Sequence, residues 1–188
     1  MRSTIFLVRH ARSVPPTPNG PDEYQRSLTE TGRAQANQLA DRLADLDPGV
    51  VISSPYLRAV QTLEPAAQQW NLPIHTDPRL REWDSGIEPT PDHARHYAQS
   101  WAHPQRARPG AESLHELTER AVHTLTDIVD GLQGRPAVIG SHGTFIARAL
   151  IGLGCLGVSR DFQQAMPMPA VYRLEFGGSI VYAVGPGL

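Results

Sequence analysis

The chain has 188 residues, of which 40% are hydrophobic and 19% are charged. This composition supplies enough apolar side chains for one compact domain and excludes a disordered chain. The 17 basic and 19 acidic residues nearly cancel, which excludes the basic surface of a nucleic-acid-binding protein and a polybasic membrane anchor. We therefore expect a single domain over residues 1–188 that acts on a small molecule, with neither nucleic acid nor membrane as a partner.

The cysteine content and the N-terminus bear on the cellular compartment. Cys155 is the only cysteine, so no internal disulfide can form and an oxidising compartment is not required. The N-terminal MRSTIFLVRH begins with a basic residue and a short apolar run. That run is too short for a signal peptide, and no small-residue cleavage site follows it. We expect a cytoplasmic protein.

Three short apolar runs predict buried strands. They cover residues 4–8, 50–52 and 137–140, and unbroken runs of this length are typical of strands covered on both faces of a sheet. Near the C-terminus, residues 171–176 and 179–184 alternate on either side of a Gly-Gly pair. This pattern predicts an antiparallel hairpin.

Helical patterns separate these strands. The first begins at the N-cap Thr29 and stops before Pro48-Gly49. The second follows Ser53-Ser54-Pro55, with the proline expected at the first helical position. Pro65 predicts a kink or an end near Glu64, because proline cannot donate a backbone hydrogen bond. Further helices are predicted at 114–132 and 145–151.

The region from Trp70 to Gly110 is rich in proline and histidine and only weakly periodic. One helical pattern stands out in it, over residues 93–101. We interpret residues 83–110 as a small lid region.

Strands that alternate with helices predict an α/β fold with a mostly parallel central sheet flanked by helices. Ligands of such sheets bind beyond the carboxyl ends of the strands. His10, Arg58 and His142 each follow a predicted strand. The topology is therefore expected to bring these three side chains together.

The residue types at the strand ends suit metal-free phosphoryl transfer through histidine. Arg9 and Arg58 can give a phosphate dianion bidentate contacts from guanidinium groups that keep their charge. Positive charge beside His10 disfavours protonation of its ring and so leaves a nucleophilic nitrogen. Glu82 is the candidate acid that donates a proton to the departing oxygen.

These residues lie in six segments. They are LVRHA at 7–11, LTETGRAQA at 28–36, SSPYLRAVQT at 53–62, LRE at 80–82, GAES at 110–113 and SHG at 141–143. In content and order the segments resemble the histidine phosphatase superfamily, which includes the cofactor-dependent phosphoglycerate mutases. The joint match is far more specific than any single segment.

The resemblance implies a three-layer α/β sandwich of the phosphoglycerate mutase type, without a metal or another cofactor. It implies that His10 is the nucleophile and Glu82 the acid and then the base. It also implies a phosphate pocket made by Arg9, Arg58, His142 and Gly143.

Glu112 lies in the GAES segment, for which the resemblance implies a place near the substrate. A role as the cap of the following helix, beside Ser113, is an equal alternative. Ala11 departs from the family pattern, which usually has glycine there. A positive φ at this position would cost alanine about 1 kcal/mol.

The leading interpretation is a phosphomonoesterase that hydrolyses a small phosphorylated metabolite through a phosphohistidine on His10. Two alternatives stay open. The first is a phosphoglycerate mutase-type transfer, which we disfavour because mutases have longer intervening and terminal segments. The second is a catalytically weak regulator that binds a phosphorylated ligand, for which Ala11 is the only sequence support.

Two further patterns are weaker. His93 and His96 have a spacing that can bind a metal, but no cysteine or carboxylate cluster completes such a site. Residues 152–157 match GxGxxG, yet they follow a predicted helix, whereas a dinucleotide-binding loop follows a strand. Neither pattern predicts a cofactor.

Overall fold

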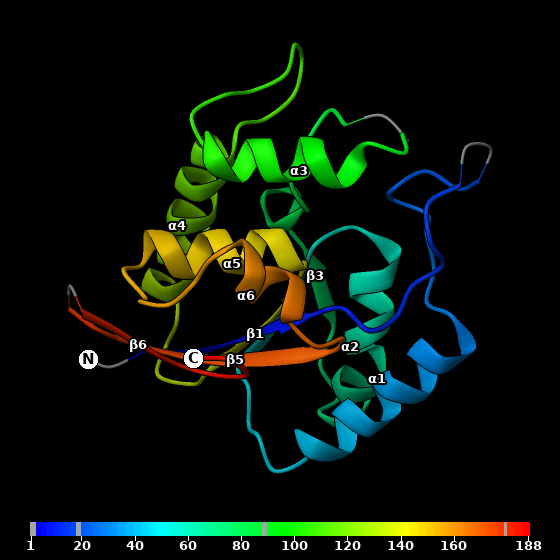
Figure 1. The fold of residues 1–188 in the computed structure, drawn as a ribbon. Helices are drawn as coiled ribbons and strands as arrows, with labels where there is room; N and C mark the ends of the chain where they lie inside the picture. The colour runs from blue at the N-terminus through cyan, green and yellow to red at the C-terminus, as the bar shows by residue number, and fades with distance from the viewer. Residues whose placement is uncertain (1–2, 18–19, 88–89, 179) are drawn as a thin grey trace.

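A six-stranded sheet forms the middle layer of the fold (Figure 1). The computed structural model describes residues 3–17, 20–87, 90–178 and 180–188, without the side chain of Ile180. The strands are β1 (Ser3–Arg9), β2 (Val50–Ser53), β3 (Ile74–Thr76), β4 (Ala137–Ser141), β5 (Ala170–Gly177) and β6 (Ile180–Val184), and their order is β3-β2-β4-β1-β5-β6. The first four strands in this order are parallel, whereas β5 and β6 are antiparallel additions.

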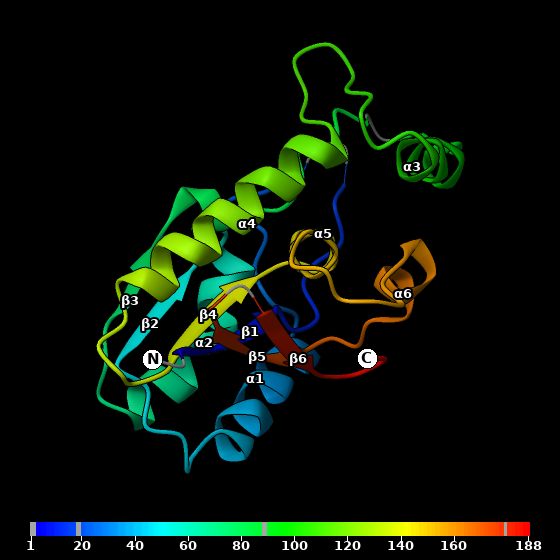
Figure 2. The same ribbon diagram turned by 90° about the vertical axis from the view of Figure 1, so that its left-hand side faces the viewer.

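Helices cover both faces of this sheet. Figure 2 shows α1 (Glu30–Arg42) and α2 (Leu57–Gln69) on one face, with α4 (Leu114–Asp130) and α5 (Gly143–Gly152) on the opposite face. Two more helices, α3 (His93–Ala102) and α6 (Arg160–Ala165), lie on the α5 side, and a 3₁₀ turn η1 covers Pro78–Leu80. The predicted α/β sandwich with a mostly parallel sheet is confirmed. In the described part of the chain, no helix is long and apolar enough to cross a bilayer.

The buried side chains explain why these strands read as unbroken apolar runs. Successive residues of a strand point to opposite faces of the sheet. Ile5 and Leu7 of β1 therefore pack in the core under α4 and α5, while Val8 packs with Leu39 and Leu63 in a second core under α1 and α2. Because both faces are covered, neither needs polar residues.

Most predicted elements are present within one or two residues. Thr29 caps α1, and its hydroxyl oxygen accepts the Gly32 N–H at 3.0 Å. The helix over 93–101 appears as α3 and the C-terminal hairpin as β5 and β6, although Ser179 lies outside the described residues. Residues 152–157 follow α5, so they lack the preceding strand of a dinucleotide-binding loop.

The predicted helix end near Glu64 is wrong, because α2 continues through Pro65 to Gln69. An interior proline costs about 3 kcal/mol in lost hydrogen bonding and steric conflict. Ala66 and Ala67 lie directly after it and are buried. The packing of α2 between α1 and the sheet therefore overrides the local preference.

Two helix ends also differ from prediction. Pro55 is not the first helical residue, because the Ser54 hydroxyl accepts the Tyr56 N–H and the helix starts only at Leu57. The first helix ends at Arg42, and Leu46 reaches the core from the turn that follows it. β3 and α6 were not predicted, because a strand of three residues and a helix of six residues are too short to show a period.

Candidate active site

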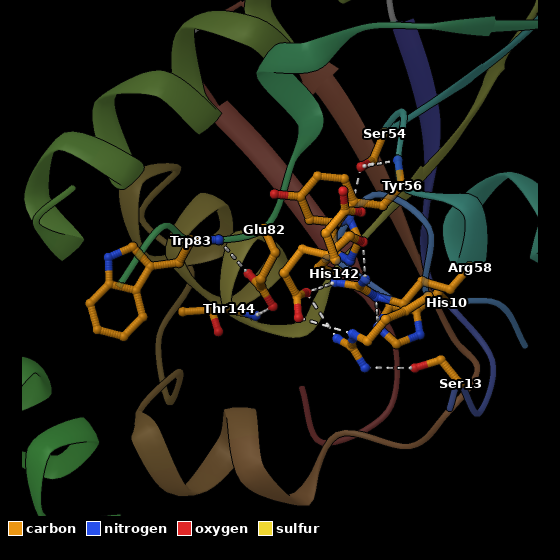
Figure 3. A network of polar contacts seen from close by, with 12 residues as sticks. His10, Ser13, Ser54, Tyr56, Arg58, Glu82, Trp83, His142 and Thr144 are labelled. Carbon is orange, nitrogen blue, oxygen red and sulfur yellow. Dashed lines mark hydrogen bonds and ion pairs between the residues drawn. The ribbon is translucent and has the colours of Figure 1, made fainter. Parts of the chain in front are cut away.

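The carboxyl ends of β1, β2 and β4 place the candidate residues together (Figure 3). Arg9, the last residue of β1, lies opposite Ser141 of β4. His10 continues this pairing, because its backbone N–H donates to the Ser141 carbonyl at 3.1 Å. The His10 and His142 rings consequently meet edge to face, with centroids 5.2 Å apart. The structure thus brings both histidines and Arg58 together, as the topology predicts.

The contacts of His10 define which ring nitrogen is free. Nδ1 lies 2.7 Å from the Ala11 carbonyl oxygen, which only accepts, so we assign the ring proton to Nδ1. Nε2 accepts from Nε of Arg58 at 3.3 Å. Burial and then the charge of Arg58 lower the His10 pKa to about 3. At neutral pH the ring is uncharged, and Nε2 carries a lone pair beside a guanidinium group.

Arg58 lies in the first turn of α2 with 2% of its surface exposed. Nη1 donates to the Glu23 backbone carbonyl at 2.8 Å, and Nη2 donates to Oε2 of the same residue at 2.9 Å. The Glu23 carboxylate also accepts from Nε and Nη2 of Arg26, both at 2.9 Å. One carboxylate therefore bridges two guanidinium groups next to His10.

Arg26 and Glu23 were not among the predicted site residues. Their spacing of three residues is the one signal that could have suggested an ion pair. The sequence offers no strand end or motif that would have placed this pair against Arg58. The contact arises because the loop before α1 folds back over the start of α2, where the Leu57 N–H donates to the Tyr24 carbonyl at 2.8 Å.

Arg9 packs against the first residue of α5. Its Nη1 donates to the Met166 carbonyl oxygen, while its buried Nε has no hydrogen-bond partner among the described residues. A Cβ at Gly143 would lie 3.1 Å from both Cζ and Nε of Arg9. Glycine at 143 therefore permits this close approach, and Arg9 keeps one buried donor for an anion.

His142 is fully buried between the other site residues. Its Nε2 lies 2.8 Å from the Ser54 hydroxyl oxygen, and Nδ1 has no partner among the described residues. Burial and then the nearby positive charge of Arg58 hold the His142 pKa well below its usual value. His142 is a second neutral imidazole in the pocket.

Glu82 is fixed by backbone donors at the start of α5. Oε1 accepts the N–H groups of Trp83 at 2.9 Å and of Phe145 at 3.0 Å. Oε2 accepts the Thr144 N–H at 3.1 Å. The carboxylate thus caps the helix N-terminus, where negative charge is favoured, and Oε2 keeps a lone pair for a proton.

Glu112 is not the cap of α4, and its place near the substrate stays a prediction. Its carboxylate forms a two-pronged ion pair with Nε and Nη2 of Arg120, both at 2.7 Å. The cap of α4 is Ser113, whose side chain and backbone exchange hydrogen bonds with Glu116. The Glu112 carbonyl accepts from the Trp83 indole at 2.7 Å, so the Glu112 backbone holds the Trp83 side chain in place.

Ala11 fits its position without strain. Asn71 is the one non-glycine residue with a positive φ in the described ranges, so Ala11 avoids that penalty. The Ala11 methyl group is buried with Leu28 and Ala36, and its N–H donates to Thr62 Oγ1 at 2.9 Å. The alanine at position 11 therefore gives no structural support to the alternative of a catalytically weak regulator.

A cavity of about 850 Å³ opens beside Glu82. Its walls come from the loop before α1, the segment around Trp83, helix α3 and helix α6. The side chains that line it include Tyr24, Tyr56, Trp83, Tyr97, Gln163 and Gln164. The region interpreted as a lid does contribute to this cavity, whereas the contribution of α6 was missed.

The described residues do not assemble a metal site. Over the described ranges no three His, Cys, Asp or Glu side chains gather as potential ligands. The His93 ring is stacked on Tyr97, with centroids 6.0 Å apart. His93 thus contacts an aromatic side chain and is not part of a metal-ligand cluster.

The fold and the site together define a class of proteins that transfer phosphoryl groups. The chain belongs to the histidine phosphatase superfamily (branch 1), whose profile matches residues 5–182. It is 31% identical to the probable phosphoglycerate mutase GpmB of Salmonella paratyphi C (strain RKS4594), over 98% of this chain and 96% of that protein.

Solved structures share the fold. YhfR of Bacillus stearothermophilus is 23% identical with a TM-score of 0.78, over 98% of this chain and 96% of that chain. A mycobacterial glucosyl-3-phosphoglycerate phosphatase in complex with VO3 is 24% identical with a TM-score of 0.76, over 98% of both chains.

Proposed function

We propose that this chain is a cytoplasmic phosphomonoesterase that hydrolyses a small phosphorylated metabolite through a phosphohistidine on His10. The observation that carries the proposal is the state of the His10 ring. Nδ1 is tied to the Ala11 carbonyl, and the unprotonated Nε2 lies 3.3 Å from Arg58 Nε. A neutral nucleophile beside a fixed cation suits attack on a phosphate dianion.

In the first step, Nε2 attacks phosphorus, and a P–N bond forms as the ester P–O bond breaks. Arg9, Arg58 and His142 offer donors to the oxygens of the transferred group, which gathers charge in the transition state. A proton from Glu82 neutralises the departing alkoxide. The organic product then leaves as an alcohol.

In the second step, water replaces the alcohol. Glu82, now ionised, takes a proton from the water as its oxygen attacks phosphorus. A P–O bond forms, the P–N bond breaks, and inorganic phosphate leaves with the electron pair of the P–N bond back on His10. The backbone donors of Glu82 keep its carboxylate on the same side of the pocket in both steps.

Phosphoglycerate mutase-type transfer is the second candidate, supported by the 31% identity to the probable mutase GpmB. A mutase must pass the phosphoryl group from His10 to a second hydroxyl before water takes it. The two activities therefore differ in product: free phosphate for a phosphatase, and a transferred ester for a mutase.

The test measures both products from the same reaction. Purified protein is incubated with a panel of phosphate esters, and free phosphate and transferred esters are both measured. We expect phosphate to account for nearly all substrate consumed, with activity that persists in excess chelator. We expect His10→Ala to lower kcat at least ~10³-fold, while the matched control His123→Ala, on the exposed surface of α4, stays near wild type. Activity of His10→Ala within tenfold of wild type would contradict the proposal.

A further inference from the structure

We infer that the cavity beside Glu82 selects phosphate esters whose organic part is uncharged, such as a sugar or polyol, and rejects esters that carry a second anionic group. This inference rests on the proposed function, because it assigns the ester whose phosphate His10 would attack. It follows from the size, the lining and the charge of the cavity.

The size and lining suit a neutral organic group. The cavity of about 850 Å³ is within the range that holds a drug-sized molecule. Four aromatic rings line it, from Tyr24, Tyr56, Trp83 and Tyr97. Flat ring faces give contact area to a sugar or another ring.

Polar groups on the opposite wall add hydrogen-bonding capacity without charge. Gln163 and Gln164 of α6 line the cavity with amide groups that both donate and accept. Ser85 contributes a hydroxyl. These groups match the hydroxyls of an uncharged substrate.

The charges of the lining oppose a second anion. Glu23, Glu82 and Asp84 are the acidic residues of the lining, and Arg81 is the one arginine or lysine among the described lining residues. Glu23 is already paired with Arg26 and Arg58, so Asp84 is the acidic residue left to oppose a second anion. His93 also lines the cavity, where its ring stacks on Tyr97. Arg81 makes two long contacts, since Nη2 lies 3.8 Å from Glu112 Oε1 and Nη1 donates to the Pro78 carbonyl at 3.5 Å. Asp84 is exposed and forms no ion pair with any residue that the structure describes.

None of the three arginines of the lid region, Arg95, Arg106 and Arg108, is among the lining residues of the cavity. Arg95 pairs with Asp92, the residue before α3. Arg108 donates to the Ser85 and His96 carbonyls and to the Ser100 hydroxyl, so it holds the lid region together. The sequence has no lysine at all. A carboxylate or second phosphate on the substrate would therefore meet Asp84, and Arg81 is the one arginine or lysine of the described lining that could offset this repulsion.

A matched pair of esters tests the inference. Glycerol 3-phosphate and 3-phosphoglycerate have the same length and differ at the far carbon, which is a hydroxymethyl group in the first and a carboxylate in the second. We expect kcat/KM to be at least roughly tenfold higher for glycerol 3-phosphate. Two like charges a few ångströms apart near a protein surface repel each other strongly enough to lower binding by about that factor or more. Both esters are compared with p-nitrophenyl phosphate in the same buffer.

Variants at Asp84 should change the ratio of kcat/KM for glycerol 3-phosphate to kcat/KM for 3-phosphoglycerate. We expect Asp84→Asn to reduce the preference for glycerol 3-phosphate, and Asp84→Arg to abolish or reverse it, with p-nitrophenyl phosphate measured as the reference substrate for each variant. The matched control is Asp92→Asn, which removes an exposed carboxylate directly before α3 that pairs with Arg95. It should leave the ratio at the wild-type value.

Two outcomes would overturn the inference: equal or better use of 3-phosphoglycerate by the wild type, or an unchanged ratio in Asp84→Arg. Either result with intact, His10-dependent hydrolysis of p-nitrophenyl phosphate would leave the proposed function standing. The same ranking is measured by calorimetric binding of both esters to His10→Ala, which needs no turnover. Absence of all hydrolysis would overturn the proposed function, and the binding ranking would still decide the inference.

Discussion

The phosphoryl pocket and the cavity beside it are built in different ways. His10, Arg9 and His142 follow from the ends of paired strands, and His142 is fully buried. The cavity walls come from the loop before α1, the segment around Trp83, and helices α3 and α6, which contribute several exposed side chains. Under the proposed function, the sheet would therefore fix how phosphate is held, and the surrounding segments would decide which ester reaches it.

The difference extends to the hydrogen bonds. In the pocket, His10 and Glu82 are oriented by backbone carbonyl and N–H groups. In the cavity, side chains contact one another, as in the 3.1 Å contact between the Tyr97 hydroxyl and Thr144 Oγ1. Changes to the pocket should thus cost much more activity than changes to the cavity wall.

After loss of the nucleophile His10, the largest effect should come from Glu82→Gln. The alkoxide that leaves from an alkyl phosphate is a strong base and needs a proton, whereas p-nitrophenolate is a weak base and can leave without one. We expect the phosphorylation burst to slow by roughly 10²–10⁴ for an alkyl phosphate and much less for p-nitrophenyl phosphate. Because the NH2 of the glutamine amide cannot accept, the backbone N–H groups bound to one of the two Glu82 oxygens lose their acceptor, and thermal unfolding must be measured alongside. Equal losses with both esters would remove Glu82 from the acid role.

Removal of Arg58 should have the next largest effect. Arg58→Ala deletes the guanidinium next to His10 Nε2, and loss of one such donor costs about 10²–10³ in kcat. The matched control is Arg79→Ala, because Arg79 is exposed and pairs with Asp77 and Asp127. Circular dichroism checks that the buried substitution folds. A folded Arg58→Ala variant with nearly normal kcat/KM would show that the pocket does not depend on this cation.

Stability should depend on pH through the two buried histidines. The His10 pKa is lowered from 6.5 to about 3 in the folded protein, so the unfolded chain binds more protons between these values. The contribution of the neutral His10 to stability is therefore fully present above the pKa of 6.5 in the unfolded chain, and it is lost as the pH falls below that value. We expect guanidinium unfolding to show a loss of about 2–3 kcal/mol from His10 between neutral pH and about pH 4.5, and His142 adds a loss in the same direction.

His10→Asn isolates the contribution of His10 in that experiment. The variant has no titratable ring at position 10, so its free energy of unfolding should fall less on acidification than that of the wild type. His142 continues to contribute in both proteins, since its pKa is also lowered by burial. Parallel curves for the two proteins would show that His10 does not stay neutral in the folded state.

The smallest effect should come from the cavity wall. Tyr97→Phe removes the hydroxyl that joins α3 to Thr144 at the start of α5. One such hydrogen bond contributes about 1 kcal/mol, so we expect kcat/KM to fall less than about tenfold, mainly through KM. Tyr182→Phe, at an exposed position of β6, is the control. A fall in kcat/KM as large as that of Arg58→Ala would mean that the phosphoryl pocket and the cavity wall do not contribute separately to activity.

Much of the pocket could be predicted because its residues follow recognisable strands. The apolar runs before His10 and His142 locate the strand ends, and the parallel topology then brings the side chains together. Glu82 lies on no regular element, and it was predicted from its motif. Its contact with the N-terminus of α5 depends on the packing of η1 and the following segment.

The cavity could not be predicted to the same depth. Glu23 and Arg26 gain their place from tertiary contacts with Arg58, and α6 is a single short helix without a detectable period. Glu112 shows the reverse case. Its motif suggested the substrate, but Arg120, eight residues along the chain, claims both of its carboxylate oxygens.

The most direct test of the account is the chemical position of the phosphate on the enzyme. Rapid quench at alkaline pH during turnover, followed by peptide mass spectrometry and phosphorus NMR, identifies the phosphorylated atom. Because Nδ1 is bonded to the Ala11 carbonyl and Nε2 faces Arg58, we predict an acid-labile phosphate on Nε2 of His10. Its rate of formation should match or exceed turnover. Phosphate on Nδ1, on another residue, or on none during a measured burst would contradict the central claim.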